Sequence, residues 1–154
     1  MFTKILFPTD FSDTADQSIE YIKQLQNVGA KKIIVINIIH QRIIDTLDTM
    51  HKAIYFQDGR FQEDAEKAER DLEEKRSEKL AGIVTELETV GYEVTAKVLK
   101  GYPVKEILRV EKEEAVSLII MGSHGRSNFR RARIGSVSEK VIRRSVSPVL
   151  LIKR

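Results

Sequence analysis

The sequence contains no cysteine and only three prolines in 154 residues. The absence of cysteine excludes disulfides, thiolate metal ligands and a cysteine nucleophile. Long hydrophobic runs are missing too: the longest, residues 33–39, is far shorter than the roughly 20 residues that cross a bilayer, and it contains Asn37. The first residues, MFTKILFPTDF, lack the basic stretch and continuous apolar segment of a signal peptide. We therefore expect a cytoplasmic protein without a membrane partner.

Hydrophobic residues make up 42% and charged residues 32% of the chain, and no segment is dominated by Pro, Gly, Ser or Gln. These values are typical of a folded protein, and this length is usual for one domain with a single core. We expect residues 1–154 to form that domain. The net charge is only +3, but residues 126–154 carry nine Lys or Arg against one acid, Glu139. An anion-attracting surface is therefore expected around the C-terminal elements.

Short apolar runs alternate with amphipathic segments along the chain. Residues 32–39 form a β-branched run without alternation, which is typical of a strand covered on both faces. Helical periodicity is clearest over residues 61–90. Strands are predicted at residues 4–7, 32–39, 92–99, 117–121 and 149–152, with helices beginning near 13, 61, 103 and 136. This alternation predicts an α/β fold: a single doubly wound domain with a parallel sheet and helices on both faces.

Residues 40–60 have a weak pattern, which fits either a loop or a short helix over the ligand site. The start of the last helix carries a clearer signal. Ser136-Val137-Ser138-Glu139 matches a capping box, in which Ser136 accepts from the backbone amide three residues on and Glu139 reaches back. The sequence therefore predicts Ser136 as the N-cap.

Unusual residues follow the first and fourth predicted strands. Pro8-Thr9-Asp10 comes after the first strand, and Gly122-Ser123-His124-Gly125 comes after the fourth. Ligands of open parallel sheets bind at the carboxyl ends of the strands, where the strand order reverses. The second segment leads on to Gly135-Ser136 at a helix N-terminus, whose unpaired amides attract anions. Glycines let phosphate oxygens approach the backbone, so we interpret the two segments as a nucleotide site.

The glycines form the pattern G-x-x-G, nine residues, then G-S, which is neither a dinucleotide fingerprint nor a P-loop. Together with KILFPTDFSDTADQSIEYI near the start and VLKGYPVKEIL in the middle, this pattern makes the sequence resemble the universal stress protein family. The resemblance extends along nearly the whole chain, except for about residues 41–75. It implies a five-stranded parallel sheet in the order 3-2-1-4-5 and ATP as the ligand, because family members with G-2x-G-9x-G-(S/T) bind ATP.

The resemblance also assigns a part of the nucleotide to each matching position. Asp10 and Ile38 would border the adenine, and Met121 would pack beneath the nucleotide. The ribose would lie near Pro8, Thr9 and Gly122. The phosphates would be surrounded by Gly125, Arg126, Gly135, Ser136 and Val137, with Ser123 and His124 completing the set of candidate residues.

Four arginines, Arg126, Arg130, Arg131 and Arg133, lie between the second and third glycines. One or two of them are expected to reach the β- and γ-phosphates, where a guanidinium makes paired, charge-assisted hydrogen bonds. The family often has apolar residues just before the third glycine, so Arg131 and Arg133 depart from its pattern and add positive charge. ATP is therefore expected to bind more tightly than AMP.

Catalytic residues are not evident in the sequence. It shows neither a Ser-His-Asp set nor a cluster at metal-ligand spacing, so hydrolysis would be slow and any Mg or Mn would arrive on the phosphates. We therefore interpret the chain as an ATP-dependent switch or sensor in the stress response. One alternative is a nucleotide-transferring or slow ATP-hydrolysing enzyme of a related α/β fold. A nucleic-acid-binding protein is less favoured, because Phe129 is the only aromatic residue in the arginine segment.

The last predicted strand, residues 149–152, is apolar and has no following helix to cover it. A free edge of this kind invites pairing with another chain. In the family, two subunits commonly associate through this strand. We therefore expect a homodimer in which a two-fold axis pairs the strand with its own copy.

Overall fold

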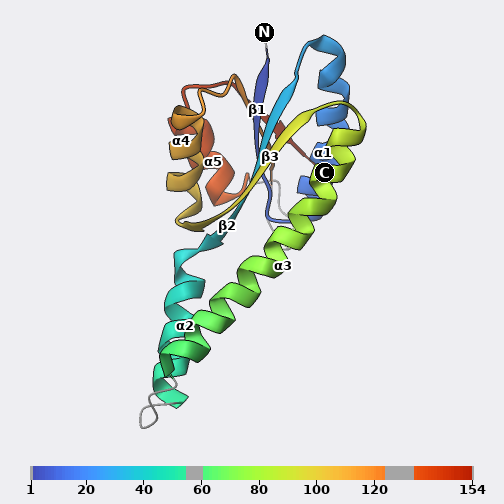
Figure 1. Cartoon of the computed structure of the whole chain (residues 1–154). Helices are drawn as coiled ribbons and strands as arrows, with labels where there is room; N and C mark the ends of the chain where they lie inside the picture. The colour runs from blue at the N-terminus through green and yellow to red at the C-terminus, as the bar shows by residue number, and fades with distance from the viewer. Residues whose placement is uncertain (1, 55–60, 124–133, 154) are drawn as a thin grey trace.

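A parallel sheet forms the centre of the fold. The structure is a computed structural model that describes residues 2–54, 61–123 and 134–153. Within these residues five parallel strands form one sheet in the order β3-β2-β1-β4-β5 (Figure 1). The strands are β1 (Lys4–Pro8), β2 (Lys32–His40), β3 (Glu93–Gly101), β4 (Leu118–Gly122) and β5 (Val149–Ile152). The predicted α/β class, the parallel sheet and the strand order are confirmed.

The central strands are buried on both faces, because helices cover each face. Along β1, Ile5 and Phe7 belong to one apolar cluster and Leu6 belongs to the other. The first cluster includes side chains of α1 (Asp13–Leu25) and α3 (Phe61–Thr89), and the second includes side chains of α4 (Pro103–Glu113) and α5 (Ser136–Arg144). Figure 1 shows these two pairs of helices on opposite sides of the sheet. The continuous apolar run in β2 follows from this arrangement, since neither of its faces meets solvent.

Two glycines end the helical segments that precede β2 and β3. A 3₁₀ turn, η1 (Gln26–Val28), continues α1, and Gly29 follows it with a φ of 102°. Gly91 follows α3 with a φ of 95°. These left-handed values favour glycine, which has no Cβ to clash with the preceding turn.

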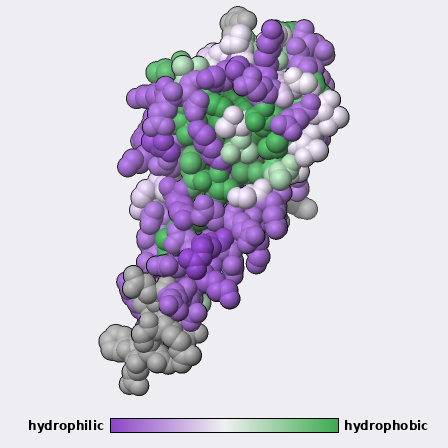
Figure 2. Space-filling view, in the orientation of Figure 1, coloured by the Kyte–Doolittle hydropathy of each residue, from purple (hydrophilic) through white to green (hydrophobic). Residues whose placement is uncertain are grey.

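Residues 41–54 form a helix, α2 (Gln41–Ile54), so the described residues contain five α-helices rather than the predicted four. This helix packs against the first part of α3 and against β2, and the two helices project away from the sheet (Figure 1). Of the two alternatives predicted for residues 40–60, the helix is present, but its residues do not line the ligand cavity described below. Figure 2 shows the projection as mostly hydrophilic. Residues 55–60 lie outside the described part of the chain.

None of the helices in the described ranges combines the length and the apolar character that a membrane crossing requires.

The capping box predicted at the start of α5 is wrong. Gly135, with φ −61° and ψ 150°, is the N-cap, and Ser136 is the first helical residue. No side chain of the described residues caps this end, and Glu139 instead pairs with Arg143 one turn later, with 3.2 Å between Oε1 and Nε. Because the helix begins one residue earlier than the box requires, its first backbone amides have no side-chain partner within the described ranges.

A buried carboxylate fixes the turn that leads into β5. Glu111 of α4 is 2% exposed, and its Oε1 accepts hydrogen bonds from the backbone amides of Val146 and Ser147 at 2.9 and 2.7 Å. The hydroxyl of Ser145 donates to the same oxygen at 3.1 Å. Hydrogen bonds to a charged group are stronger than neutral ones. Helix α4 therefore determines where β5 begins and how it joins β4.

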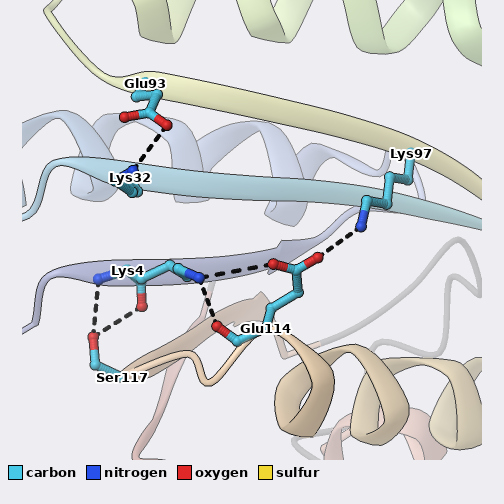
Figure 3. A network of polar contacts seen from close by, with 6 residues as sticks. All are labelled: Lys4, Lys32, Glu93, Lys97, Glu114 and Ser117. Carbon is cyan, nitrogen blue, oxygen red and sulfur yellow. Dashed lines mark hydrogen bonds and ion pairs between the residues drawn. The ribbon is translucent and has the colours of Figure 1, made fainter.

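A second carboxylate, Glu114, links β1 to β3 across the intervening β2 (Figure 3). Lys97 of β3 donates to the Glu114 carboxylate at 2.8 Å. Lys4 of β1 donates to the backbone carbonyl of Glu114 at 2.7 Å and lies 3.7 Å from its carboxylate. The hydrogen bond from Lys97, with a smaller contribution from Lys4, holds the pKa of Glu114 below its ordinary value of 4.5. The charged form of Glu114 is therefore favoured in the folded state.

We predict that Glu114→Gln lowers stability at pH 7 but not at pH 3. Since the folded state lowers the pKa of Glu114, the unfolded chain binds more protons as pH falls below about 4.5, and the stabilisation from the carboxylate is then lost. Urea midpoints of the wild type and the variant should therefore converge at low pH. Glu88→Gln, at an exposed position of α3, is the control and should show no such convergence. A gap for Glu114→Gln that persists at pH 3 would contradict this account.

Candidate functional site

A cavity of about 290 Å³ opens at the carboxyl ends of β1 and β4. The connections from these two neighbouring strands run to opposite sides of the sheet, which makes this position the switch point of the fold. Residues of β2 and of helices α1, α4 and α5 complete its walls. The lining residues are Pro8, Thr9, Asp10, Ala15, Ile38, Pro103, Ile107, Met121, Gly122, Gly135, Ser136, Val137 and Ser138.

The turn after β1 is held by hydrogen bonds from the neighbouring strand. The backbone amide of Thr9 donates to the Ile36 carbonyl at 2.9 Å, and the buried Asn37 side chain donates from Nδ2 to the Thr9 carbonyl at 2.7 Å. The Asp10 carboxylate accepts from the backbone amide of Ser12 at 3.1 Å. Phe11, between them, has a φ of 60°, which bulky residues seldom adopt. Strained backbone of this kind is often found at binding sites, where the surrounding contacts maintain it.

Gly122 ends β4 at a point that two helices approach closely. A Cβ placed on Gly122 would lie 3.0 Å from both Cβ and Oγ1 of Thr14 on α1. From the other side of the sheet, the Ser138 hydroxyl of α5 donates to the Gly122 carbonyl at 2.9 Å. A larger residue at 122 would therefore displace α1 and disturb this anchor of α5.

The N-terminus of α5 is fixed next to the cavity by backbone contacts. The amide of Gly135 donates to the Ser123 carbonyl at 2.7 Å, and the amide of Ser123 donates to the Ile152 carbonyl of β5 at 2.7 Å. The first turn of α5 therefore lies beside the end of β4, and Ser136 and Val137 line the cavity. Unpaired amides and the positive end of the helix dipole make this first turn attractive to an anion.

Nine of the thirteen candidate residues proposed from the sequence line this one cavity. Ser123 is buried behind it and acts there through its backbone, while His124, Gly125 and Arg126 lie outside the described residues. The arginines at 130, 131 and 133 lie outside them as well. The nine lining residues are Pro8, Thr9, Asp10, Ile38, Met121, Gly122, Gly135, Ser136 and Val137.

Sequence reasoning missed four residues of the cavity wall: Ala15, Pro103, Ile107 and Ser138. In the sequence, Ala15 and Ile107 are recognisable only as apolar core positions, and Pro103 only as the start of a helix. Ser138 stood in the predicted capping box, but its hydroxyl reaches a carbonyl sixteen positions earlier in the chain. No local pattern could have indicated that contact.

The cavity wall is better suited to holding a ligand than to transforming one. Ile38, Ile107 and Met121 offer apolar surface, and the first turn of α5 offers backbone donors. Asp10 is the only acidic or basic side chain among the described lining residues. Its carboxylate already accepts a backbone hydrogen bond within the turn. A flat apolar group with a tethered anion fits this chemistry.

The comparison with protein families agrees with the arrangement of the site. Residues 1–153 match the model of the universal stress protein family. The chain belongs to this family. The resemblance inferred from the P-T-D turn and the glycine spacing is therefore confirmed, and this universal stress protein shows the α/β fold expected of it.

Similar proteins cover nearly its full length. It is 36% identical over 158 residues to the universal stress protein MJ0577 of Methanocaldococcus jannaschii, covering 100% of this chain and 96% of the relative. The solved structure of MJ0577 matches with a TM-score of 0.84 at 35% identity, over 100% of this chain and 97% of that one. The crystal structure of the protein PH0823 matches with a TM-score of 0.76 at 29% identity, over the same shares. A universal stress protein from Archaeoglobus fulgidus, solved in complex with dAMP, shares the fold, with a TM-score of 0.63 at 20% identity over 99% of this chain and 100% of that one.

We predict that Ser138→Ala destabilises the protein by about 1 kcal/mol, because it removes one hydrogen bond and leaves the Gly122 carbonyl without its partner. Ser136→Ala is the matched control. Ser136 lies two residues earlier on the same turn, is exposed, and has no side-chain cap hydrogen bond. Urea unfolding of both variants without nucleotide checks this. Equal midpoints for the two variants would show that Ser138 does not anchor α5.

Proposed function

We propose that this universal stress protein binds ATP in the cavity between β1 and β4 and acts as a nucleotide-dependent switch or sensor. One observation carries the proposal: residues from the P-T-D turn and from the glycine pattern, more than 110 positions apart in the sequence, line a single cavity beside the open N-terminus of α5. The walls supply apolar surface for a base, and the helix supplies donors for phosphates.

Each part of the nucleotide has a group of residues proposed to hold it. The adenine would lie between Ile38 and Asp10, and Met121 would pack beneath the nucleotide. The ribose would contact Pro8, Thr9 and Gly122. The phosphates would lie against Gly135 and accept hydrogen bonds from the amides of Ser136 and Val137, together with Gly125 and Arg126 from the adjoining segment.

The proposal has support from a relative and from the chemistry of the site. The Archaeoglobus fulgidus protein of the same fold has been solved in complex with dAMP, an adenine nucleotide. Phosphoryl transfer requires a positioned base or nucleophile besides charge neutralisation. Asp10, the one acid of the described lining, is engaged within its own turn, so we propose a switch rather than an efficient enzyme. Mg²⁺ or Mn²⁺ would be bound by the phosphates themselves.

Ser136→Pro should reduce ATP affinity about tenfold or more while leaving the fold intact. Proline is well tolerated at the first helical position, and the extended Gly135 before it, with ψ 150°, suits a following proline. The change removes one backbone amide from the phosphate site, where a hydrogen bond to a charged group contributes roughly 1.5–3 kcal/mol. Calorimetric titration with ATP and with adenosine measures the effect.

Two controls make this experiment decisive. Ser136→Ala removes the hydroxyl but keeps the amide, so its ATP affinity should remain closer to that of the wild type. Adenosine, which has no phosphate, should bind the wild type and Ser136→Pro equally. The proposal is wrong if ATP does not bind the wild type, and the placement of the phosphates is wrong if Ser136→Pro binds ATP as the wild type does.

We further propose a homodimer through β5. This strand stands at the end of the sheet order, with β4 as its neighbour on one side among the described strands. Leu150 in its middle is 37% exposed, and Val146 just before it is 81% exposed. Pairing with a second β5 around a two-fold axis would satisfy the free backbone edge and cover Leu150.

Leu151→Pro should shift the protein towards the monomer. Proline has no backbone amide and is tolerated poorly inside a sheet, so it weakens pairing along β5. Light scattering of the wild type should give the mass of a dimer, and the variant should give a lower mass. Thermal unfolding checks that the variant is folded. A monomeric wild type at high concentration would rule out the dimer.

A further inference from the structure

A second cavity, of about 790 Å³, lies next to the nucleotide cavity. It is a groove between α4 and α5, and residues at the end of β2 and the start of α2 close one end of it. Pro103, Ser136 and Val137 line both cavities, so the two spaces share a wall at the N-terminus of α5. We call this space the basic groove.

Basic side chains line the groove on both sides. Lys105 and Lys112 stand two turns apart on α4, and Lys140 and Arg144 stand one turn apart on α5. Arg42 of α2 joins them at the end of the groove. At 1.5 Å of rise per residue, each helix presents these charges at intervals of roughly 6–10 Å.

These five cations have no acidic partner within the described residues. Arg109, a sixth cation of the groove, is neutralised by Glu106 at 2.7 Å and by Glu113. Glu139, the acid of α5, pairs with Arg143 at 3.1 Å. Concentrating five unpaired positive charges costs electrostatic free energy, which an anion in the groove would offset.

The groove contains one aromatic pair, at its end near β2. The rings of His40 and Tyr102 meet edge to face with their centroids 5.5 Å apart, and Tyr102 is 53% exposed. Grooves for single-stranded nucleic acid carry a series of aromatic rings on which successive bases stack. The α4 and α5 walls contribute no further aromatic residue, which disfavours a nucleic-acid strand.

We propose that the basic groove binds a linear chain of phosphates, either as free polyphosphate or as the extended phosphate chain of a nucleotide. Such a chain carries a negative charge at every unit and has no side chains to accommodate between two helices. An acidic peptide in extended form presents charges to one face only at every second residue, about 7 Å apart, and so places fewer negative charges along the same length of groove. Binding of a nucleotide's phosphate chain rests on the proposed ATP site, because that chain would have to extend past the shared wall into the groove. Binding of free polyphosphate does not depend on the ATP site.

The experiment uses inorganic tripolyphosphate as the probe, with calorimetric titration at low and at moderate salt. The test variant is Lys112→Gln/Lys140→Gln, which removes one exposed cation from each wall. The matched control is Lys67→Gln/Lys75→Gln, which removes two exposed lysines of α3 and leaves the same net charge. The test variant should bind tripolyphosphate about tenfold more weakly than the wild type, and the control should remain within about twofold.

Further titrations distinguish the two sources of the chain. If bis-adenosine pentaphosphate binds the wild type more tightly than ATP does, and this difference disappears in the test variant, the groove holds the phosphate chain of a nucleotide. If the protein does not bind ATP but binds tripolyphosphate through the two lysines, the result supports free polyphosphate as the ligand. It then rejects only the proposal of a nucleotide site. Equal binding by test and control variants overturns the inference. So does an oligothymidylate or an oligoglutamate that binds through the two lysines more tightly than tripolyphosphate does.

Discussion

The close approach of two helices to Gly122 is the constraint on which the rest of the site depends. Thr14 of α1 would lie only 3.0 Å from a Cβ on one side, and Ser138 of α5 binds the Gly122 carbonyl on the other. The residue that ends β4 therefore determines the position of both helices relative to the sheet. Because no side chain of the described residues caps α5 here, its first amides are available to a ligand. The same contacts that stabilise the fold thus create the proposed anion site.

The elements around Gly122 show how the chain positions a ligand with little side-chain chemistry. Hydrogen bonds from β2 fix the turn after β1, and Glu111 of α4 fixes the turn before β5. In each arrangement one atom of a buried side chain binds the backbone: Nδ2 of Asn37 donates to the Thr9 carbonyl, and Oε1 of Glu111 accepts from the amide of Ser147. The other oxygen of each side chain, Oδ1 of Asn37 and Oε2 of Glu111, has no hydrogen-bond partner among the described residues. The walls of the cavity are thus positioned mainly by contacts to the backbone.

The strands could be predicted from the sequence because runs of β-branched residues favour strands, and glycine and proline interrupt them. The strand order came from the resemblance to the family, since local patterns carry no information about which strands pair. Helix α2 was predicted only as one of two alternatives, a loop or a short helix, because β2 runs into it at Gln41 without a glycine, a proline or a capping residue. The P-T-D turn and Gly122 were found from their places at the ends of predicted strands and from the glycine spacing. Ser138 and the basic groove depend on helices meeting in space. The capping-box prediction was wrong because the local sequence pattern does not indicate that Gly135 is extended and serves as the N-cap.

The most direct test of the account is a backbone amide spectrum of the protein recorded during titration with ATP. The account predicts that the largest shift changes occur at Thr9, Gly122, Gly135, Ser136 and Val137, the described residues that surround the cavity at the ends of β1 and β4. Amides on the α2–α3 projection should remain unchanged. Saturable changes centred on that projection, or none at all with ATP in large excess, would contradict the central claim that this cavity holds the nucleotide.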